Sequence, residues 1–149
     1  MSPTNNKYPV AFAFLVEFPL ADKMDIDVEF QEVSGLKVKL DTEKWTEGGE
    51  NRFVHNLPNR PTYDPLVLKR AVVTSSPLIT WVTKAVEEFE FKPLDVIVKL
   101  LNEEHQPLIS WTFVNTWPTS WEVSTFNAEE GKLAIETLNM QYDYFRRIG

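Results

Sequence analysis

The chain has 149 residues, of which 43% are hydrophobic and 25% charged, the composition of a soluble globular domain. It contains no cysteine, which excludes disulfides and thiolate metal sites. The formal net charge is −7, so the chain lacks the basic field that attracts nucleic acid. We expect a flexible N-terminal segment over residues 1–9 and a single domain over residues 10–149.

The N-terminal residues contain no recognisable targeting signal. Residues 1–9 are polar and lack the basic-then-apolar layout of a signal peptide. The apolar run over residues 10–18 is about half the length of a membrane span. We therefore expect a chain made in the cytoplasm without a direct membrane segment.

The first elements are predicted as strands, because apolar side chains recur every second residue. This alternation runs over residues 10–18 and again over residues 25–31. Gly35 suits a tight turn or a bulge, and residues 36–40 then resume the alternation.

Residues 42–65, called the arm here, combine glycines and prolines with an unusual number of apolar side chains. Residues 44–46 can pair with residues 52–55 as a long hairpin, whereas Pro58, Pro61 and Pro65 are expected to interrupt a regular ladder. A loop this long and apolar is uncommon unless it packs on something. We expect it to dock on another chain; the alternative is that it folds back over its own core. The candidate intersubunit contact residues are Trp45, Glu47, Gly48, Gly49, Asn51, Phe53, Leu57, Pro58 and Tyr63.

One helix is predicted, over about residues 77–90, after a strand at residues 66–73. Ser76 is a suitable N-cap, and Pro77 takes the first helical position, where its missing N–H costs nothing. Apolar side chains at helical spacing predict one buried stripe, made of Leu78, Trp81, Val82, Ala85, Val86 and Phe89. The basic pairs Lys69–Arg70 and Arg146–Arg147 are interpreted as solvated surface.

The C-terminal part is predicted as further strands. Residues 95–101 and 108–115 are predicted to form a hairpin, whose second strand ends at Trp117–Pro118. A short extended piece at residues 121–123 and a last strand at residues 133–145 follow. In the last strand, Leu133 and Ile135 point to one face while Leu138 and Met140 point to the other. A bulge at Glu136–Thr137, or burial of both faces, would reconcile them. The whole pattern indicates a mainly β fold, a two-sheet barrel with one flanking helix.

Residues that could carry catalysis are not gathered in any recognisable pattern. His55 and His105 have no metal-ligating partners at suitable spacing, and the short motifs of hydrolases and nucleotide-binding proteins are missing. The acidic pairs Glu87–Glu88, Glu103–Glu104 and Glu129–Glu130 diverge from one another and are interpreted as solubilising charge. We therefore predict no enzyme, no catalytic, cofactor-binding or metal-binding residues, and no cofactor.

Several segments, in order and across nearly the whole chain, carry a resemblance to a known family. They are residues 30–36 (FQEVSGL), 47–51 (EGGEN), 57–58 (LP), 66–70 (LVLKR), Trp81, 96–100 (VIVKL), 111–118 (WTFVNTWP) and 135–138 (IETL). The chain resembles the tail tube proteins of contractile phage tails and extracellular contractile injection systems, and more distantly the inner-tube proteins of type VI secretion.

This resemblance implies a structural role. Six copies would form a ring, and rings would stack into a hollow inner tube surrounded by a contractile sheath and attached to baseplate and spike proteins. Sheath contraction would drive the tube and its cargo effectors into a target, from a particle assembled in the cytoplasm and released outside the cell. One alternative is a tube-to-baseplate adaptor of the same fold. A more distant alternative is a small ligand-binding β-barrel or enzyme.

Overall fold

The computed structural model describes residues 13–20, 23–46, 54–74, 76–89, 92–124, 129 and 134–148; for residues 20, 23–29, 43–46 and 54–58 only the backbone is described. Its elements in chain order are β1 (Ala13–Leu20), β2 (Lys23–Phe30), β3 (Glu32–Ser34), β4 (Val38–Thr46), β5 (Val54–Tyr63), β6 (Leu66–Ala71), α1 (Pro77–Glu87), β7 (Leu94–Leu101), β8 (Pro107–Val123), β9 (Ile135–Gln141) and β10 (Tyr144–Ile148). The chain forms two compact units, Gly35–Asp64 and the remainder, each described by itself.

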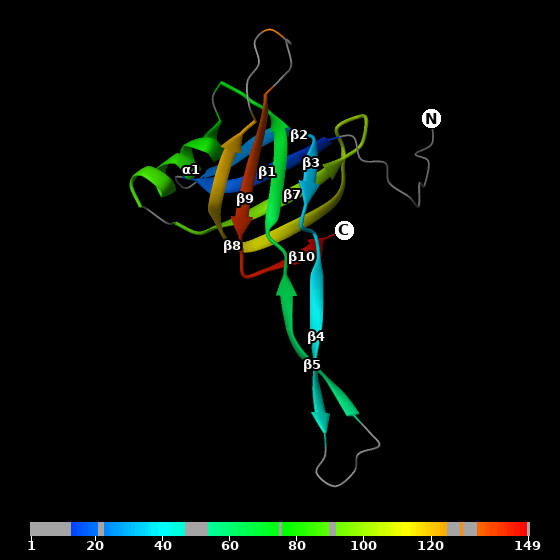
Figure 1. Cartoon of the computed structure of the whole chain (residues 1–149). Coiled ribbons are helices and arrows are strands. Elements are labelled where there is room, and N and C mark those ends of the chain that lie inside the picture. The colour runs from blue at the N-terminus through cyan, green and yellow to red at the C-terminus, as the bar shows by residue number, and fades with distance from the viewer. Residues whose placement is uncertain are drawn as a thin grey trace, which may run out of the picture. The chain divides into compact units, whose positions relative to one another are not determined.

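The larger unit contains one connected set of strands and the helix (Figure 1). The predicted mainly β fold with one helix is confirmed. Hydrogen-bonded neighbours follow the order β2-β1-β7-β8-β9-β6-β3, and β10 pairs with β8. Across the described strands this path is open, with β2 and β3 at its two ends, so the closed form of the predicted barrel is not found. Along the chain, Gln31 connects the end of β2 to the start of β3. Its N–H donates to the carbonyl oxygen of Lys69 on β6 at 3.0 Å.

Strand β8 is shared by two groups of strands. Its first part pairs with β7 on one edge and with β10 on the other, and its second part pairs with β9. The prediction that Trp117–Pro118 ends this strand is wrong, because β8 runs on to Val123. Pairing with β7 stops at Thr116, so beyond that point β8 has a neighbour on one edge only. Proline is tolerated on a strand with an unpaired edge.

A bulge marks the point where β8 changes partners. Asn115 has a φ of 53°, in the left-handed region that asparagine tolerates better than most residues. Its N–H donates to Asp95 Oδ1 at 3.1 Å, and its side-chain Nδ2 donates to Asp143 Oδ2 at 2.7 Å. The register of β7 against β8 shifts at this position, between Leu94 and Val96. Two carboxylates from neighbouring segments therefore hold the bulge in place.

Replacing Asn115 with alanine is expected to lower the free energy of unfolding by about 1–3 kcal/mol, since alanine disfavours a positive φ and lacks the amide donor. Asn115→Gly accepts the backbone conformation and loses only the side-chain hydrogen bond, so its cost is expected to be smaller. Urea denaturation of both variants measures the difference. An alanine variant as stable as the glycine variant would show that the positive φ carries no cost.

The last predicted strand is two strands, and its predicted bulge is misplaced. Pairing of β9 with β6 and β8 continues without a shift through Glu136 and Thr137, whereas the break falls at Tyr142–Asp143. Leu133 of the parity conflict lies outside the described residues, and for Ile135 neither prediction holds. Glu136 shares the buried face with Leu138 and Met140, while Ile135 is exposed on the other face.

Helix α1 begins as predicted. Ser76 is the N-cap, and its Oγ accepts a hydrogen bond from the N–H of Ile79 at 3.3 Å. The first part of the predicted stripe is buried, namely Leu78, Trp81, Val82 and Ala85. The prediction is wrong for Val86 and Phe89, which are 64% and 80% exposed. The helix ends at Glu87, earlier than predicted, so Phe89 leaves the helical stripe.

The interior of the larger unit is filled by apolar side chains from the strands and the helix. The largest fully buried ones include Phe18, Leu66, Leu68, Leu78, Val96, Val98, Phe113, Leu138 and Met140. Phe113 packs edge-on against Tyr142, with ring centroids 4.8 Å apart. Among the described residues, no helix is both long and apolar enough to cross a membrane.

Candidate intersubunit site

The smaller unit, Gly35–Asp64, contains an antiparallel hairpin of β4 and β5. Thr46 pairs with Val54 and Trp45 with His55, which confirms the predicted hairpin where its residues are described. The pairing is longer than predicted and extends back to Val38. β4 and β5 form a sheet of two strands, and an isolated two-stranded hairpin is only marginally stable in water.

The hairpin continues through two prolines of the arm, but its ladder is not regular there. Pro58 pairs with Thr42 and Pro61 with Leu40, and the register shifts between these two pairs, as the predicted interruption requires, while Pro65 follows the end of β5. A two-stranded ribbon explains how the hairpin continues, because each strand has one unpaired edge toward which a residue without an N–H can be turned.

The nine candidate contact residues have different positions relative to the described hairpin. Trp45 lies on β4, and Leu57, Pro58 and Tyr63 lie on β5, where Tyr63 is half-buried and pairs with Val38. Glu47, Gly48, Gly49, Asn51 and Phe53 lie outside the described residues. Their role in contacts between chains stays a prediction.

The hairpin also exposes apolar side chains of the alternating segment at residues 36–40. Val38 and Leu40 on β4 are 49% and 63% exposed. On the same ribbon, Thr62 Oγ1 donates to Asp41 Oδ2 at 3.3 Å, and Lys39 lies 3.6 Å from Asp41. The described part of the hairpin thus carries exposed apolar groups beside polar ones, as surfaces that bind a partner do.

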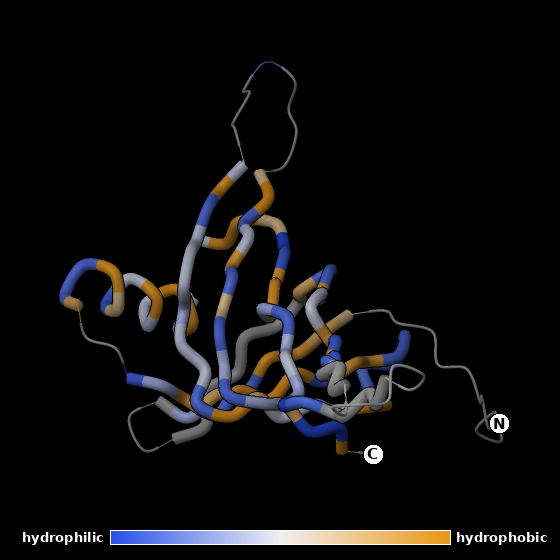
Figure 2. Tube along the Cα trace, turned by 60° about the horizontal axis from the view of Figure 1, so that its bottom comes forward, coloured by the Kyte–Doolittle hydropathy of each residue, from blue (hydrophilic) through white to orange (hydrophobic). Residues whose placement is uncertain are grey.

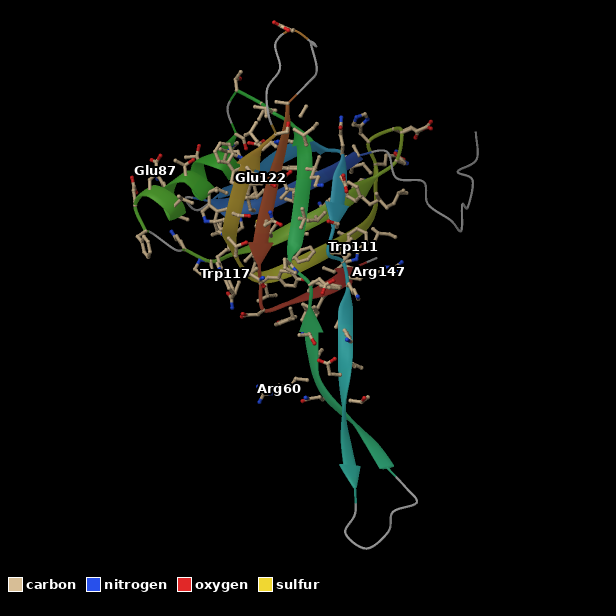
Figure 3. The ribbon with its side chains drawn as sticks, in the orientation of Figure 1. Arg60, Glu87, Trp111, Trp117, Glu122 and Arg147 are labelled. Atoms are coloured by element: carbon tan, nitrogen blue, oxygen red, sulfur yellow. The ribbon has the colours of Figure 1, made fainter. Side chains whose placement is uncertain are left out.

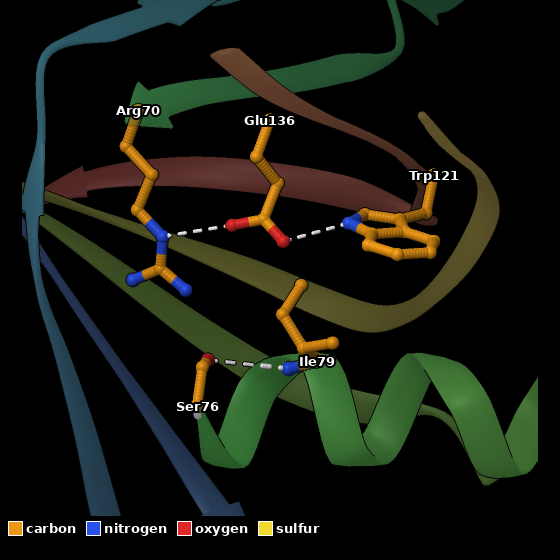
Figure 4. Close-up of polar contacts among 5 residues, drawn as sticks. All are labelled: Arg70, Ser76, Ile79, Trp121 and Glu136. Carbon is orange, nitrogen blue, oxygen red and sulfur yellow. Dashed lines mark hydrogen bonds and ion pairs between the residues drawn. The ribbon is translucent and has the colours of Figure 1, made fainter. Parts of the chain in front are cut away.

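A buried polar cluster lies in the larger unit. Arg70 Nε donates to Glu136 Oε2 at 3.1 Å, and the indole Nε1 of Trp121 donates to Glu136 Oε1 at 2.8 Å (Figure 4). The guanidinium carbon of Arg70 lies 4.4 Å from the centre of the Phe30 ring. Both charged side chains are almost fully buried, so the interpretation of Arg70 as solvated surface is wrong.

The sequence contained a signal for this ion pair. Arg70 continues the alternation of Leu66 and Leu68, and Glu136 begins that of Leu138 and Met140. Two opposite charges, each on the apolar face of its strand, indicate a buried pair. The cluster joins β6, β9 and β8 with the end of β2. Because both carboxylate oxygens of Glu136 accept hydrogen bonds, we interpret the cluster as a structural connection between these strands.

Metal-ligating side chains of the described residues do not gather in a group of three or more. A shallow depression of about 310 Å³ lies along α1 and is lined by Thr74, Ser76, Ile79, Thr80, Thr83, Lys84, Glu87 and Glu88. Figure 3 shows Glu87 at the end of that helix.

Comparisons with known proteins agree with this description. The family model of the T4-like virus tail tube protein gp19 matches residues 10–146. The chain belongs to this family, whose members are structural proteins of tail tubes. No curated protein sequence matches the chain.

Solved structures share the fold over nearly the whole chain. A chain in the anti-feeding prophage baseplate, solved with six-fold symmetry, is 29% identical with a TM-score of 0.83 and 97% coverage of both chains. A chain of the PVC sheath-tube complex of an extracellular contractile injection system is 20% identical with a TM-score of 0.78, covering 100% of this chain and 99% of that one. Hcp1 from Flavobacterium johnsoniae is 17% identical with a TM-score of 0.53, covering 93% and 96%.

Proposed function

We propose that this chain is the main inner-tube subunit of a contractile injection particle. Six copies form a ring, and rings stack into a hollow tube. The observation that carries this proposal is the likeness to a chain of a six-fold symmetrised baseplate over 97% of both chains, together with membership in the tail tube family. A ring that joins strands between subunits would also cover edges that β2, β3 and β10 present in a single copy.

The hairpin of β4 and β5 is the proposed contact between rings. A two-stranded ribbon with exposed Val38 and Leu40 gains stability when it packs on another chain. Trp45, Leu57 and Tyr63 would contribute apolar area to that contact, and the glycines at 48 and 49 would allow the connecting loop to fit its partner.

The further partners follow from the same role. A contractile sheath would surround the tube, baseplate and spike proteins would occupy its tip, and cargo effectors would travel in its lumen. The solved relatives come from a baseplate and from a sheath-tube complex of an extracellular system, which supports both surroundings. The particle would assemble in the cytoplasm and act outside the cell. The net charge of −7 gives the chain no basic field for nucleic acid as a partner.

Negative-stain electron microscopy of the purified full chain tests the proposal. We expect rings with six-fold symmetry that stack into long tubes with a central lumen. Single rings that never extend would instead identify a tube-to-baseplate adaptor. A folded chain that stays monomeric at every concentration would overturn the proposed function.

A further inference from the structure

Exposed apolar and acidic side chains meet at the C-terminal end of α1. We call Val86, Glu87, Glu88 and Phe89 the helix-end patch. All four are exposed, and Phe89 has the largest exposed fraction among the large apolar side chains described, at 80%. An exposed aromatic next to two carboxylates suits a partner that offers both an apolar contact and positive charge.

The helix-end patch breaks three local rules at once. Phe89 has a φ of 57°, a conformation that favours glycine and disfavours a bulky side chain. Glu87 and Glu88 lie at the end of the helix where its dipole repels negative charge. Val86 continues the helix but is exposed. Local choices that oppose the stability of a single copy are expected where a residue serves another purpose.

A second patch has the opposite charge. We call Leu108, Arg146 and Ile148 the strand-end patch, because their register places them on one face of β10 and the start of β8, whereas Arg147 points to the opposite face. Arg146 is exposed, and Ile148 is 57% exposed. The Arg146 guanidinium carbon lies 5.3 Å from the centre of the Tyr144 ring, which helps to hold it in position. Ile148 is fixed on β8, since its carbonyl oxygen accepts from Ser110 Oγ at 3.1 Å.

The two patches lie on different sides of the larger unit. Figure 3 places Glu87 at one side and strand β10, marked by Arg147, at the other, and Figure 2, turned by 60°, keeps α1 and the C-terminal end apart. One copy therefore does not bring them together. Two different, complementary patches on separate sides of one molecule are what a head-to-tail contact requires, and such contacts generate rings.

We infer that the helix-end patch of one copy docks on the strand-end patch of the next copy around the ring. The negative charge of Glu87 and Glu88 attracts Arg146 of the neighbour across the contact, and Phe89 packs beside its Ile148. The occupant is a second copy because the complementary charge and an apolar side chain lie on this chain itself. This inference rests on the proposed ring and names the surfaces that close it.

Charge reversal on each side, followed by their combination, tests the contact. Glu87→Lys with Glu88→Lys, and separately Arg146→Glu, are each expected to weaken association of the full chain about tenfold or more. The variant that combines these substitutions restores opposite charges across the contact, so its association is expected to return to within about threefold of the wild type. Sedimentation velocity over a concentration series measures all three.

Phe89→Gly separates assembly from folding. Glycine accepts the positive φ, so the melting temperature is expected to stay the same or rise. Loss of the aromatic contact is expected to weaken association about tenfold. A residue that served only the fold of one copy would not produce this opposite pair of effects.

Glu103→Lys with Glu104→Lys is the matched control, because it makes the same change in net charge in the exposed β7–β8 turn. Association of this variant is expected not to weaken. Tubes that form equally well after either reversal, or a combined variant whose association is not restored, would overturn the contact and leave the proposed tube intact. A wild-type chain that stays monomeric would overturn both.

Discussion

Replacing Arg70 with methionine is expected to lower the free energy of unfolding by about 3–5 kcal/mol, the usual cost of leaving one partner of a buried ion pair alone. Glu136, which is 3% exposed, would lose the Arg70 hydrogen bond and keep the one from the Trp121 indole. Its charge would then lack compensation in an environment that solvates it poorly. Urea denaturation of the purified chain measures the loss.

The double variant Arg70→Met with Glu136→Leu is the control for this prediction. It removes both charges and keeps apolar volume, so its stability is expected to lie within about 1 kcal/mol of the wild type. Trp121 is partly exposed, so water can replace its lost acceptor. If Arg70→Met alone cost less than about 1 kcal/mol, the ion pair would contribute little to the fold.

Replacing Trp45 and Phe53 with alanine is expected to leave a folded chain that forms rings but does not stack them. Two aromatic anchors each contribute about 1–2 kcal/mol to a contact, so the concentration needed for tube growth is expected to rise about a hundredfold. Negative-stain electron microscopy and sedimentation measure tube length and ring formation on the same samples.

Arg60→Ala is the matched control in the same hairpin. Arg60 lies on β5 with an exposed side chain (Figure 3), and its removal takes away no apolar contact. This variant is expected to stack normally. Tubes of wild-type length from the Trp45 and Phe53 double variant would show that the hairpin does not carry the contact between rings.

The fold was predictable from sequence wherever a strand or helix has one clearly apolar face. The cap at Ser76 and the stripe from Leu78 to Ala85 are examples, since capping and helical spacing are local properties. Prediction failed where the neighbouring strand decides whether a segment continues as a strand. Pro118 is accommodated within β8 because one edge of the strand is unpaired there. The sequence of that segment does not show which strands lie beside it. The single domain over residues 10–149 stays a prediction.

The buried pair shows a different reason for failure. Arg70 was judged by residue type, as a charge that belongs in water, and Glu136 only as the place of a possible bulge; neither was judged by its position on an alternating strand. The candidate contact residues present the opposite case. Composition located an unusual segment at residues 42–65, but contacts between chains depend on a second molecule, so their partners cannot be read from one chain.

Strand β8 has a mechanical consequence for a subunit that carries load. Its 17 residues span roughly 55 Å when extended and belong to both groups of strands. A push on the strands around β7 is passed to those around β9 through one covalent backbone. Sliding one group against the other would require that backbone to stretch or its ladders to break. Such a connection would resist shear between the two groups, which would suit the proposed tube under load.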